Sequence, residues 1–179
     1  VRPLDKSDGL AGSAMATLGA TRVLGTVSLQ IGTPNVFAPR EGDLLVKLSL
    51  APFDGGPGGG GANAEQRQRA EEATVTGEAI QGCLLDAGSV VLEDLCIDEG
   101  RAAWALGLHL VCLNDDGAVL DCAMAAATAT LRTCRLPNTV PDDRGLRRVV
   151  DEPWEDRTPL PVRHSVASLT CGVWRRYGI

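Results

Sequence analysis

The chain has 179 residues, of which 44% are hydrophobic and 22% are charged, and these values are typical of a single globular domain. Its apolar runs are shorter than the roughly 18 residues of a transmembrane helix, so no membrane-spanning helix is expected. A net charge of −6 and a pI near 4.9 argue against a domain that binds nucleic acid on its own, because such domains carry a basic surface for the phosphates.

The first strands are indicated by alternating apolar residues. Residues 12–18 and 21–31 carry them on a period of about two on either side of Gly19-Ala20, which is typical of a β-hairpin. Residues 44–50 alternate in the same way and place Lys47 and Ser49 on one face. The start of the chain lacks a Met and a signal-peptide pattern, and we expect the true N-terminus to lie upstream.

A glycine-rich segment separates these strands from a long helix. Residues 55–61 are glycine apart from one proline and predict a flexible loop. Asn63 is a suitable N-cap for a helix predicted over 64–85, although two internal glycines weaken it. A strand is predicted next, over residues 90–97.

The following segment is the longest apolar run. Residues 102–113 place large side chains on one face and mostly smaller ones on the other, so both faces are predicted to be covered, as in a central strand. Residues 114–117 predict a turn, and 121–131 predict an alanine-rich helix that two later prolines end. After a polar segment, residues 166–174 predict a final strand.

Several residue types that could signal chemistry are interpreted as structural. Trp104 and Trp174 are predicted to anchor the core or an interface, since aromatic residues that stack on RNA are normally interleaved with basic ones. His109 has no second ligand in register, so it is predicted to be packed in a core or interface. Asp115 and Asp116 are predicted to bond the backbone of their turn.

The cysteines show no zinc-binding pattern, because they form neither a CxxC motif nor a Cys/His pair with the required spacing. Most of them fall within apolar strand or helix patterns. We therefore expect reduced, buried cysteines in a cytosolic or nuclear protein. The six are Cys83, Cys96, Cys112, Cys122, Cys134 and Cys171.

A family resemblance becomes visible between Val90 and Cys134. The succession Glu93-Asp-Leu-Cys-Ile97, Trp104 to Asn114, and Asp116-Gly-Ala-Val-Leu-Asp121 before the alanine helix resembles RNase PH-like domains. The match is nearest to the non-catalytic ring subunits of the eukaryotic RNA exosome. Residues 12–21 are similar to the first hairpin of those subunits, and residues 163–167 resemble the strand that leads toward the family's active-site region.

The resemblance implies an α/β fold of the two-layer α+β type, RNase PH-type and similar to ribosomal protein S5 domain 2. It implies one such domain over residues 1–179, with its C-terminal part missing. The partners implied are other RNase PH-like ring subunits, S1/KH cap proteins, and RNA that threads the ring toward a nuclease attached elsewhere. The expected location is the nucleus, with the nucleolus, and the cytoplasm.

The resemblance also bears on catalysis. Active enzymes of the family hold phosphate with arginine and assist the leaving oxygen with an aspartate beyond the strand that here ends near Trp174. The sequence stops at Ile179, so either the segment with this aspartate is cut off or the protein never had the site. We expect no catalytic residue within residues 1–179, and no metal or cofactor is predicted. Related subunits often carry arginine in the loop where this chain has Phe53-Asp54-Gly55. The candidates for RNA contact, with solvated surface positions as the alternative, are Lys47, Arg67, Arg69 and Arg163.

Three hypotheses about function remain open at this point. The first is a structural, non-catalytic subunit of the exosome ring that lines part of the RNA channel. The second is an active phosphate-dependent 3'-to-5' exoribonuclease, which requires an aspartate-bearing segment after Ile179. The third is an RNase PH-like scaffold domain in another ribonucleoprotein.

Overall fold

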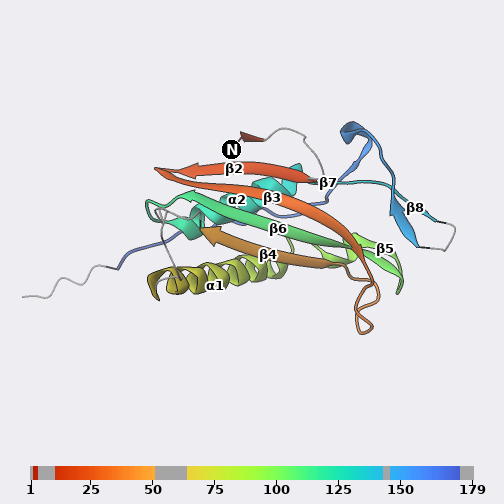
Figure 1. The fold of residues 1–179 in the computed structure, drawn as a ribbon, viewed down its shortest axis with the longest axis horizontal. Coiled ribbons are helices and arrows are strands. Elements are labelled where there is room, and N and C mark those ends of the chain that lie inside the picture. The colour runs from red at the N-terminus through yellow and green to blue at the C-terminus, as the bar shows by residue number, and fades with distance from the viewer. Residues whose placement is uncertain (1, 4–10, 51–63, 143–145, 174–179) are drawn as a thin grey trace, which may run out of the picture.

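One large sheet forms the centre of the computed structural model, which describes residues 2–3, 11–50, 64–142 and 146–173 (Figure 1). The elements are, in chain order, β1 (Arg2–Pro3), β2 (Gly12–Leu18), β3 (Thr21–Gly32), β4 (Asp43–Leu50), α1 (Ala64–Asp86), the 3-10 helix η1 (Leu92–Leu95), β5 (Cys96–Asp98), β6 (Ala102–Asn114), α2 (Val119–Thr133), β7 (Arg135–Leu136), β8 (Thr139–Pro141), β9 (Arg147–Val149), the 3-10 helix η2 (Trp154–Asp156) and β10 (Thr158–Pro159). The sheet has the order β1-β2-β3-β6-β4, with β5 paired to β6. The β4–β6 pair is parallel, and the other pairs of this sheet are antiparallel.

The predictions for the first strands and the first helix are confirmed. β2 and β3 form a hairpin, and its turn residue Gly19 has a φ of +62°, a left-handed value that favours glycine. β4 alternates exposed and buried side chains, so Lys47 is exposed while Val46 and Leu48 are buried. Helix α1 ends at Asp86, one residue beyond the predicted end.

Small side chains allow α2 to lie close to β2 and β3. A methyl group at Gly12 would lie 2.8 Å from the backbone nitrogen of Cys134, and a methyl group at Gly25 would overlap the Thr130 side chain. The helix presents buried alanines to this contact, including Ala126. Because protein interiors are close-packed, the two layers have no room for larger residues here.

Helix α1 packs along the edge strand β4 and runs in the opposite direction. Gly77 faces the strand, where a methyl group would lie 3.2 Å from the Leu48 nitrogen. The Val46 N–H donates a hydrogen bond to Oε1 of Gln81 at 3.0 Å, which satisfies a backbone donor of this edge strand. The first turns of α1 therefore lie toward the carboxyl end of β4 (Figure 1).

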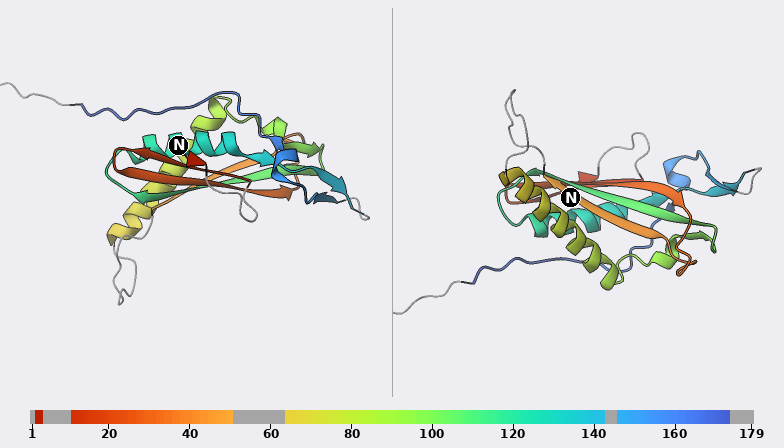
Figure 2. Two further views of the ribbon diagram at one scale, coloured as in Figure 1. Left: turned by 90° about the horizontal axis from the view of Figure 1, so that it is seen from above. Right: turned by 60° about the horizontal axis from the view of Figure 1, so that its bottom comes forward.

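Both helices lie on the same face of the sheet (Figure 2), and their buried side chains share one hydrophobic core with it, which confirms the predicted two-layer α/β architecture. The core between the layers contains Ile80 and Leu84 from α1 and Met124 and Leu131 from α2, each with at most 1% of its surface exposed. Burying side chains of this size contributes roughly 1.5–3 kcal/mol each to the free energy of unfolding.

The predicted strand over residues 90–97 is wrong over most of its length. Leu92–Leu95 forms a 3-10 helix instead, and strand pairing with β6 is limited to Cys96–Asp98. The Gly42 N–H donates a hydrogen bond to the Leu92 carbonyl at 2.9 Å. This hydrogen bond ties the start of the 3-10 helix to the loop before β4. The chain therefore turns at Leu92–Leu95 instead of remaining extended.

The prediction that both faces of residues 102–113 are covered is also wrong. β6 buries one face, including Trp104 as expected, but the alternate side chains are mostly half-exposed or exposed. His109 is exposed and is therefore not packed in the core of this chain. The face that carries His109 is uncovered because both described helices pack against the opposite face, the one that carries Trp104.

Helix α2 also begins and ends at other residues than predicted. It begins at Val119, before Asp121, and its preceding residue Ala118 has a left-handed φ of +52°. It ends at Thr133, because Cys134 is already extended and its N–H bonds to the Leu131 carbonyl at 3.1 Å. The prolines that were expected to end the helix lie further along the chain.

The predicted turn before the helix is confirmed, since the Gly117 N–H bonds to the Asp115 carboxylate at 3.0 Å.

The predicted final strand over 166–174 is wrong for its described part. Residues 160–173, here called the strap, are not paired in a strand ladder. Two strap groups bond to side chains of α2 instead: the Thr128 hydroxyl donates to the Val166 carbonyl at 3.1 Å, and the Thr170 N–H donates to Asp121 at 2.8 Å.

The cysteines are all free thiols, but the expectation that they are buried holds for half of them. Cys112, Cys122 and Cys134 are buried, and burial raises the pKa of the Cys134 thiol to about 12. Cys83 and Cys171 are exposed, and Cys96, the sixth, lies at an intermediate depth.

Some predicted features lie outside the described residues and are not tested. These are the glycine-rich loop 55–61, the N-cap Asn63, the segment Phe53-Asp54-Gly55 and Trp174.

Substituting Gly12 by alanine is expected to destabilise the fold, because the added methyl group meets backbone atoms of Cys134 that cannot move without displacing the end of α2. We expect a loss of about 1–3 kcal/mol in the free energy of unfolding. Urea denaturation measures this loss. Gly32→Ala is the matched control, because nothing lies within 4 Å of a methyl group at Gly32. Equal midpoints for the two variants would contradict the close approach.

Candidate functional site

The face of the sheet away from the two helices carries a row of polar side chains from four neighbouring strands. Ser13 is paired with Thr26, Thr26 with His109, and His109 with Lys47 in the strand register. His109 and Lys47 are exposed. Directly paired residues on one face of a sheet have Cβ atoms about 4.5–5.5 Å apart, so this row forms one continuous polar line.

A row of apolar side chains runs beside it on the same face. Met15 is paired with Leu24, and Leu24 with Val111. All three are partly exposed, and Leu45 on β4 is 47% exposed. A face that combines partly exposed apolar side chains with a polar row is suited to contact with another macromolecule.

The four cationic candidates from the sequence do not converge on one site. Lys47 lies on the open face of the sheet. Arg67 and Arg69 are exposed on the first turns of α1, toward the carboxyl end of β4. Arg163 lies in the strap, near the C-terminal end of α1. Its backbone N–H donates a hydrogen bond to the carbonyl of Ser89, which follows that helix, at 3.0 Å.

Arg163 is already engaged by a carboxylate. Its Nη2 donates to both oxygens of Asp94, at 3.0 and 2.9 Å. The hydroxyl of Ser89 donates to the His164 carbonyl at 2.8 Å, which adds a second contact at the same place. These contacts fasten the start of the strap to the segment between α1 and β5, and they partly neutralise the charge of Arg163.

The far end of the strap is fastened by Asp121. The nearby Ser168 hydroxyl and the hydrogen bond from the Thr170 N–H hold the pKa of the Asp121 carboxyl below its usual range. Asp121 also lies in the first turn of α2, where a negative charge is stabilised by the helix dipole. The strap is thus held at both ends by carboxylates.

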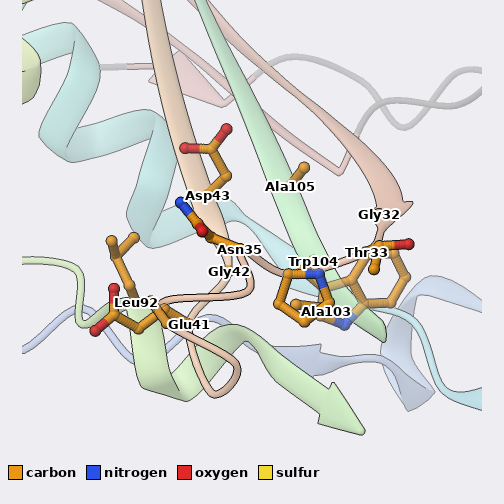
Figure 3. A pocket seen from close by; sticks show the side chains of 12 residues that line it. Gly32, Thr33, Asn35, Glu41, Gly42, Asp43, Leu92, Ala103, Trp104 and Ala105 are labelled. Atoms are coloured by element: carbon orange, nitrogen blue, oxygen red, sulfur yellow. The ribbon is translucent and has the colours of Figure 1, made fainter. Parts of the chain in front are cut away.

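A cleft of about 500 Å³ opens at the amino end of β4 (Figure 3). Residues of the loop between β3 and β4 form one side, and Ala103 and Ala105 of β6 contribute small side chains to it. Glu41 and Asp43 supply two carboxylates, and none of the residues that line the cleft is a lysine or an arginine.

The open face of the sheet is a surface that was not predicted from the sequence. Arg22 is exposed there at the start of β3, and the alternation of Arg22 with the buried Val23 could have indicated it. The exposure of His109 has no sequence signal, because it depends on which face the helices cover.

Among the described residues, no group of three or more His, Cys, Asp or Glu side chains could hold a metal ion. None of the described helices is long and apolar enough to cross a membrane.

Residues 3–137 match the profile of the 3' exoribonuclease family, domain 1, known as RNase PH. The chain belongs to the RNase PH family. The match covers the large sheet and both helices of the RNase PH domain, so the resemblance expected from the sequence is confirmed.

Relatives of this RNase PH domain are exosome components. The chain is 34% identical over 132 residues to the exosome complex component Rrp42 of Methanosarcina acetivorans, which covers 71% of the chain and 46% of that protein. It is 29% identical over 170 residues to the exosome complex component RRP45B of Arabidopsis thaliana, covering 94% of the chain and 37% of that protein. The chain therefore spans less than half the length of either relative.

The same fold occurs in a solved exosome structure. The chain superposes on a subunit of the Archaeoglobus fulgidus exosome with RNA bound to the active site, with a TM-score of 0.64 and 26% identity. The alignment covers 90% of the chain and 56% of that subunit. The RNase PH-type architecture is thereby confirmed.

Acidification is expected to release the strap from Asp121. Because the folded-state pKa of Asp121 lies below its ordinary value of 3.8, its contribution to stability is complete above that value and is lost as the pH falls through the lower, folded-state pKa. Hydrogen exchange of the Thr170 amide, followed by NMR across this range, measures the loss. Asp121→Asn keeps an oxygen acceptor without a titrating proton, so its Thr170 protection should not change with pH. The idea fails if wild type and variant lose protection together.

Proposed function

We propose that this protein is a non-catalytic subunit of the RNA exosome ring. The observation that supports this most directly is the match of nine-tenths of the chain to a subunit of a solved exosome. Its relatives in an archaeon and a plant are both exosome complex components. The work of such a subunit is to complete the ring and to form part of the channel through which RNA passes toward a nuclease.

The spacing of the cations supports a structural rather than a catalytic role. Cleavage of RNA by phosphate requires positive groups that converge on a dianion. Here Lys47, the pair Arg67 and Arg69, and Arg163 lie in three separate places, and Arg163 is held by Asp94. These four candidates therefore do not converge on one phosphate group.

The open face of the sheet supports assembly with other proteins. Its apolar row, Met15, Leu24 and Val111, stays partly exposed in the isolated chain. Contact with other RNase PH-like subunits would remove this surface from water, which favours association. We further propose that S1/KH proteins cap the assembled ring, and that the complex works in the nucleus, the nucleolus and the cytoplasm.

Contact with RNA is proposed to occur through the assembled complex at Lys47, Arg67, Arg69 and Arg163. The net charge of −6 makes strong binding by the isolated chain unfavourable. Lys47, Arg67 and Arg69 are exposed cations, whereas the ion pair with Asp94 makes Arg163 the weakest of the four candidates.

Removing Arg67 and Arg69 together is expected to weaken RNA binding by the assembled complex and to lower the slope of log affinity against log salt by about 1–2. The same measurement on Lys47→Ala should lower the slope by about 1. Fluorescence anisotropy at several salt concentrations provides these slopes. Arg163→Ala is the comparison and should lower the slope less, because its charge is already paired. Unchanged slopes for Lys47, Arg67 and Arg69 would remove these residues from the RNA path.

The proposed function is tested by tagging the full-length protein in its own organism and identifying what purifies with it. We expect several RNase PH-like proteins in stoichiometric amounts, and no release of nucleoside diphosphates when the purified protein alone is given RNA and inorganic phosphate. Phosphorolysis by the protein alone would establish the enzyme hypothesis instead. Co-purification with a different ribonucleoprotein would establish the scaffold hypothesis, and a stable monomer would contradict ring membership.

A further inference from the structure

The loop between β3 and β4 presents two large apolar side chains to solvent. Val36 is 89% exposed and Phe37 is 97% exposed. Phenylalanine normally contributes most of its surface to a core or an interface. Two adjacent apolar residues at this exposure form a protrusion, here called the Val36–Phe37 tip.

Hydrogen bonds fix the shape of this loop. The Phe37 N–H donates to the side-chain oxygen of Asn35 at 3.0 Å, and the Ala38 N–H donates to the Asn35 carbonyl at 2.9 Å. These two bonds close a turn at the tip itself. The exposed side chains therefore stand on a backbone that is already ordered.

The base of the loop is tied to the turn between β5 and β6. The Gly100 N–H donates to the Pro39 carbonyl at 2.8 Å, and Nε of Arg40 lies 2.9 Å from Oε1 of Glu99. An aromatic residue on an ordered loop loses less conformational entropy on binding than one on a free loop. The tip is consequently suited to be an interface anchor.

The cleft that contains Glu41 and Asp43, here called the acid-lined cleft, is lined by other residues of the same loop (Figure 3). Two of them, Asn35 and Ala38, flank the tip in the chain, so the cleft lies beside it. Asp43 is exposed and Glu41 is partly exposed, so both carboxylates can meet a partner. The basic side chain of the loop, Arg40, does not line the cleft and is paired with Glu99. The cleft thus favours a cationic side chain and disfavours a phosphate group.

We propose that the Val36–Phe37 tip and the acid-lined cleft form one docking surface for a neighbouring RNase PH-like subunit. That subunit supplies an apolar pocket for Phe37 and a lysine or arginine for the cleft. The inference rests on the proposed function, because it names the surface by which this chain meets one of its ring neighbours.

Charge and chemistry favour this occupant over the others. An RNA base could stack on Phe37, but aromatic platforms for RNA are accompanied by cations for the backbone, and here the adjacent groups are Glu41 and Asp43. A second copy of this chain related by a twofold axis would bring its own acidic cleft toward this one, which is unfavourable. A neighbouring subunit of complementary charge meets both requirements.

The first test replaces Phe37 by p-benzoylphenylalanine in the full-length protein and irradiates the assembled complex. Mass spectrometry then identifies the crosslinked molecule. A crosslink to an RNase PH-like subunit, at a position with a basic residue nearby, is the expected result. A crosslink to RNA, to a cap protein or to a second copy of this chain overturns the proposal, and so does the absence of a crosslink.

The second test compares matched variants by the amount of ring subunits that purifies with the tagged protein. Phe37→Ala is expected to reduce this amount at least about tenfold, as is typical of an aromatic anchor. Leu169→Ala, at a side chain that is 84% exposed on the strap, should leave it unchanged. Asp43→Lys should also reduce recovery, and Glu78→Lys, on the exposed side of α1, should not.

The outcomes separate this inference from the proposed function. If the wild-type protein recovers no RNase PH-like subunits, the proposed function fails. If the wild type recovers them and Phe37→Ala and Asp43→Lys recover them equally well, the docking surface alone is wrong. Equal thermal midpoints for wild type and variants establish that a loss of recovery reflects binding rather than folding.

Discussion

The close approach of α2 to the sheet is the constraint on which the rest of the fold depends. Gly12 and Gly25 leave no side chain between the strands and the helix, so Cys134 and Thr130 lie almost against the strand backbone. The chain that leaves the helix is tied down at the same place. The Arg135 N–H bonds to the Ala11 carbonyl at 2.8 Å, and the Leu160 N–H bonds to the Cys134 carbonyl at 3.0 Å. One tightly packed contact thereby positions the hairpin, the helix and the start of the strap.

Placing both helices on one face divides the sheet chemically. The covered face is a continuous apolar core, whereas the other face keeps a polar row that ends at Lys47 and an apolar row that includes Leu24. At the amino end of β4 the surface becomes acidic, at Glu41 and Asp43. A single domain thus offers surfaces of different chemistry.

Arg163 illustrates how tertiary contacts redefine a charged residue. In the sequence it is a cation beside a predicted strand and therefore a candidate for a phosphate. In the structure its guanidinium binds both oxygens of Asp94, a residue 69 positions away in the chain. Asp121 holds the other end of the strap in a similar way. These carboxylates serve the architecture and leave less charge available for a ligand.

The sequence by itself determined the elements whose patterns are local. The hairpin, β4 and β6 follow from the alternation of apolar residues, and α1 and α2 follow from local helix signals, namely the N-cap candidate Asn63 and the alanine-rich run 121–131. The succession from Glu93 to the alanine helix was enough to indicate the family. Tertiary structure alone decided which of these elements are covered, which is why His109 is exposed and why residues 166–173 bond to helix side chains rather than to a strand. It also decided that Phe37 stands out from an ordered loop. Periodicity reports the conformation of neighbouring residues, whereas burial and pairing depend on residues that are distant in the chain.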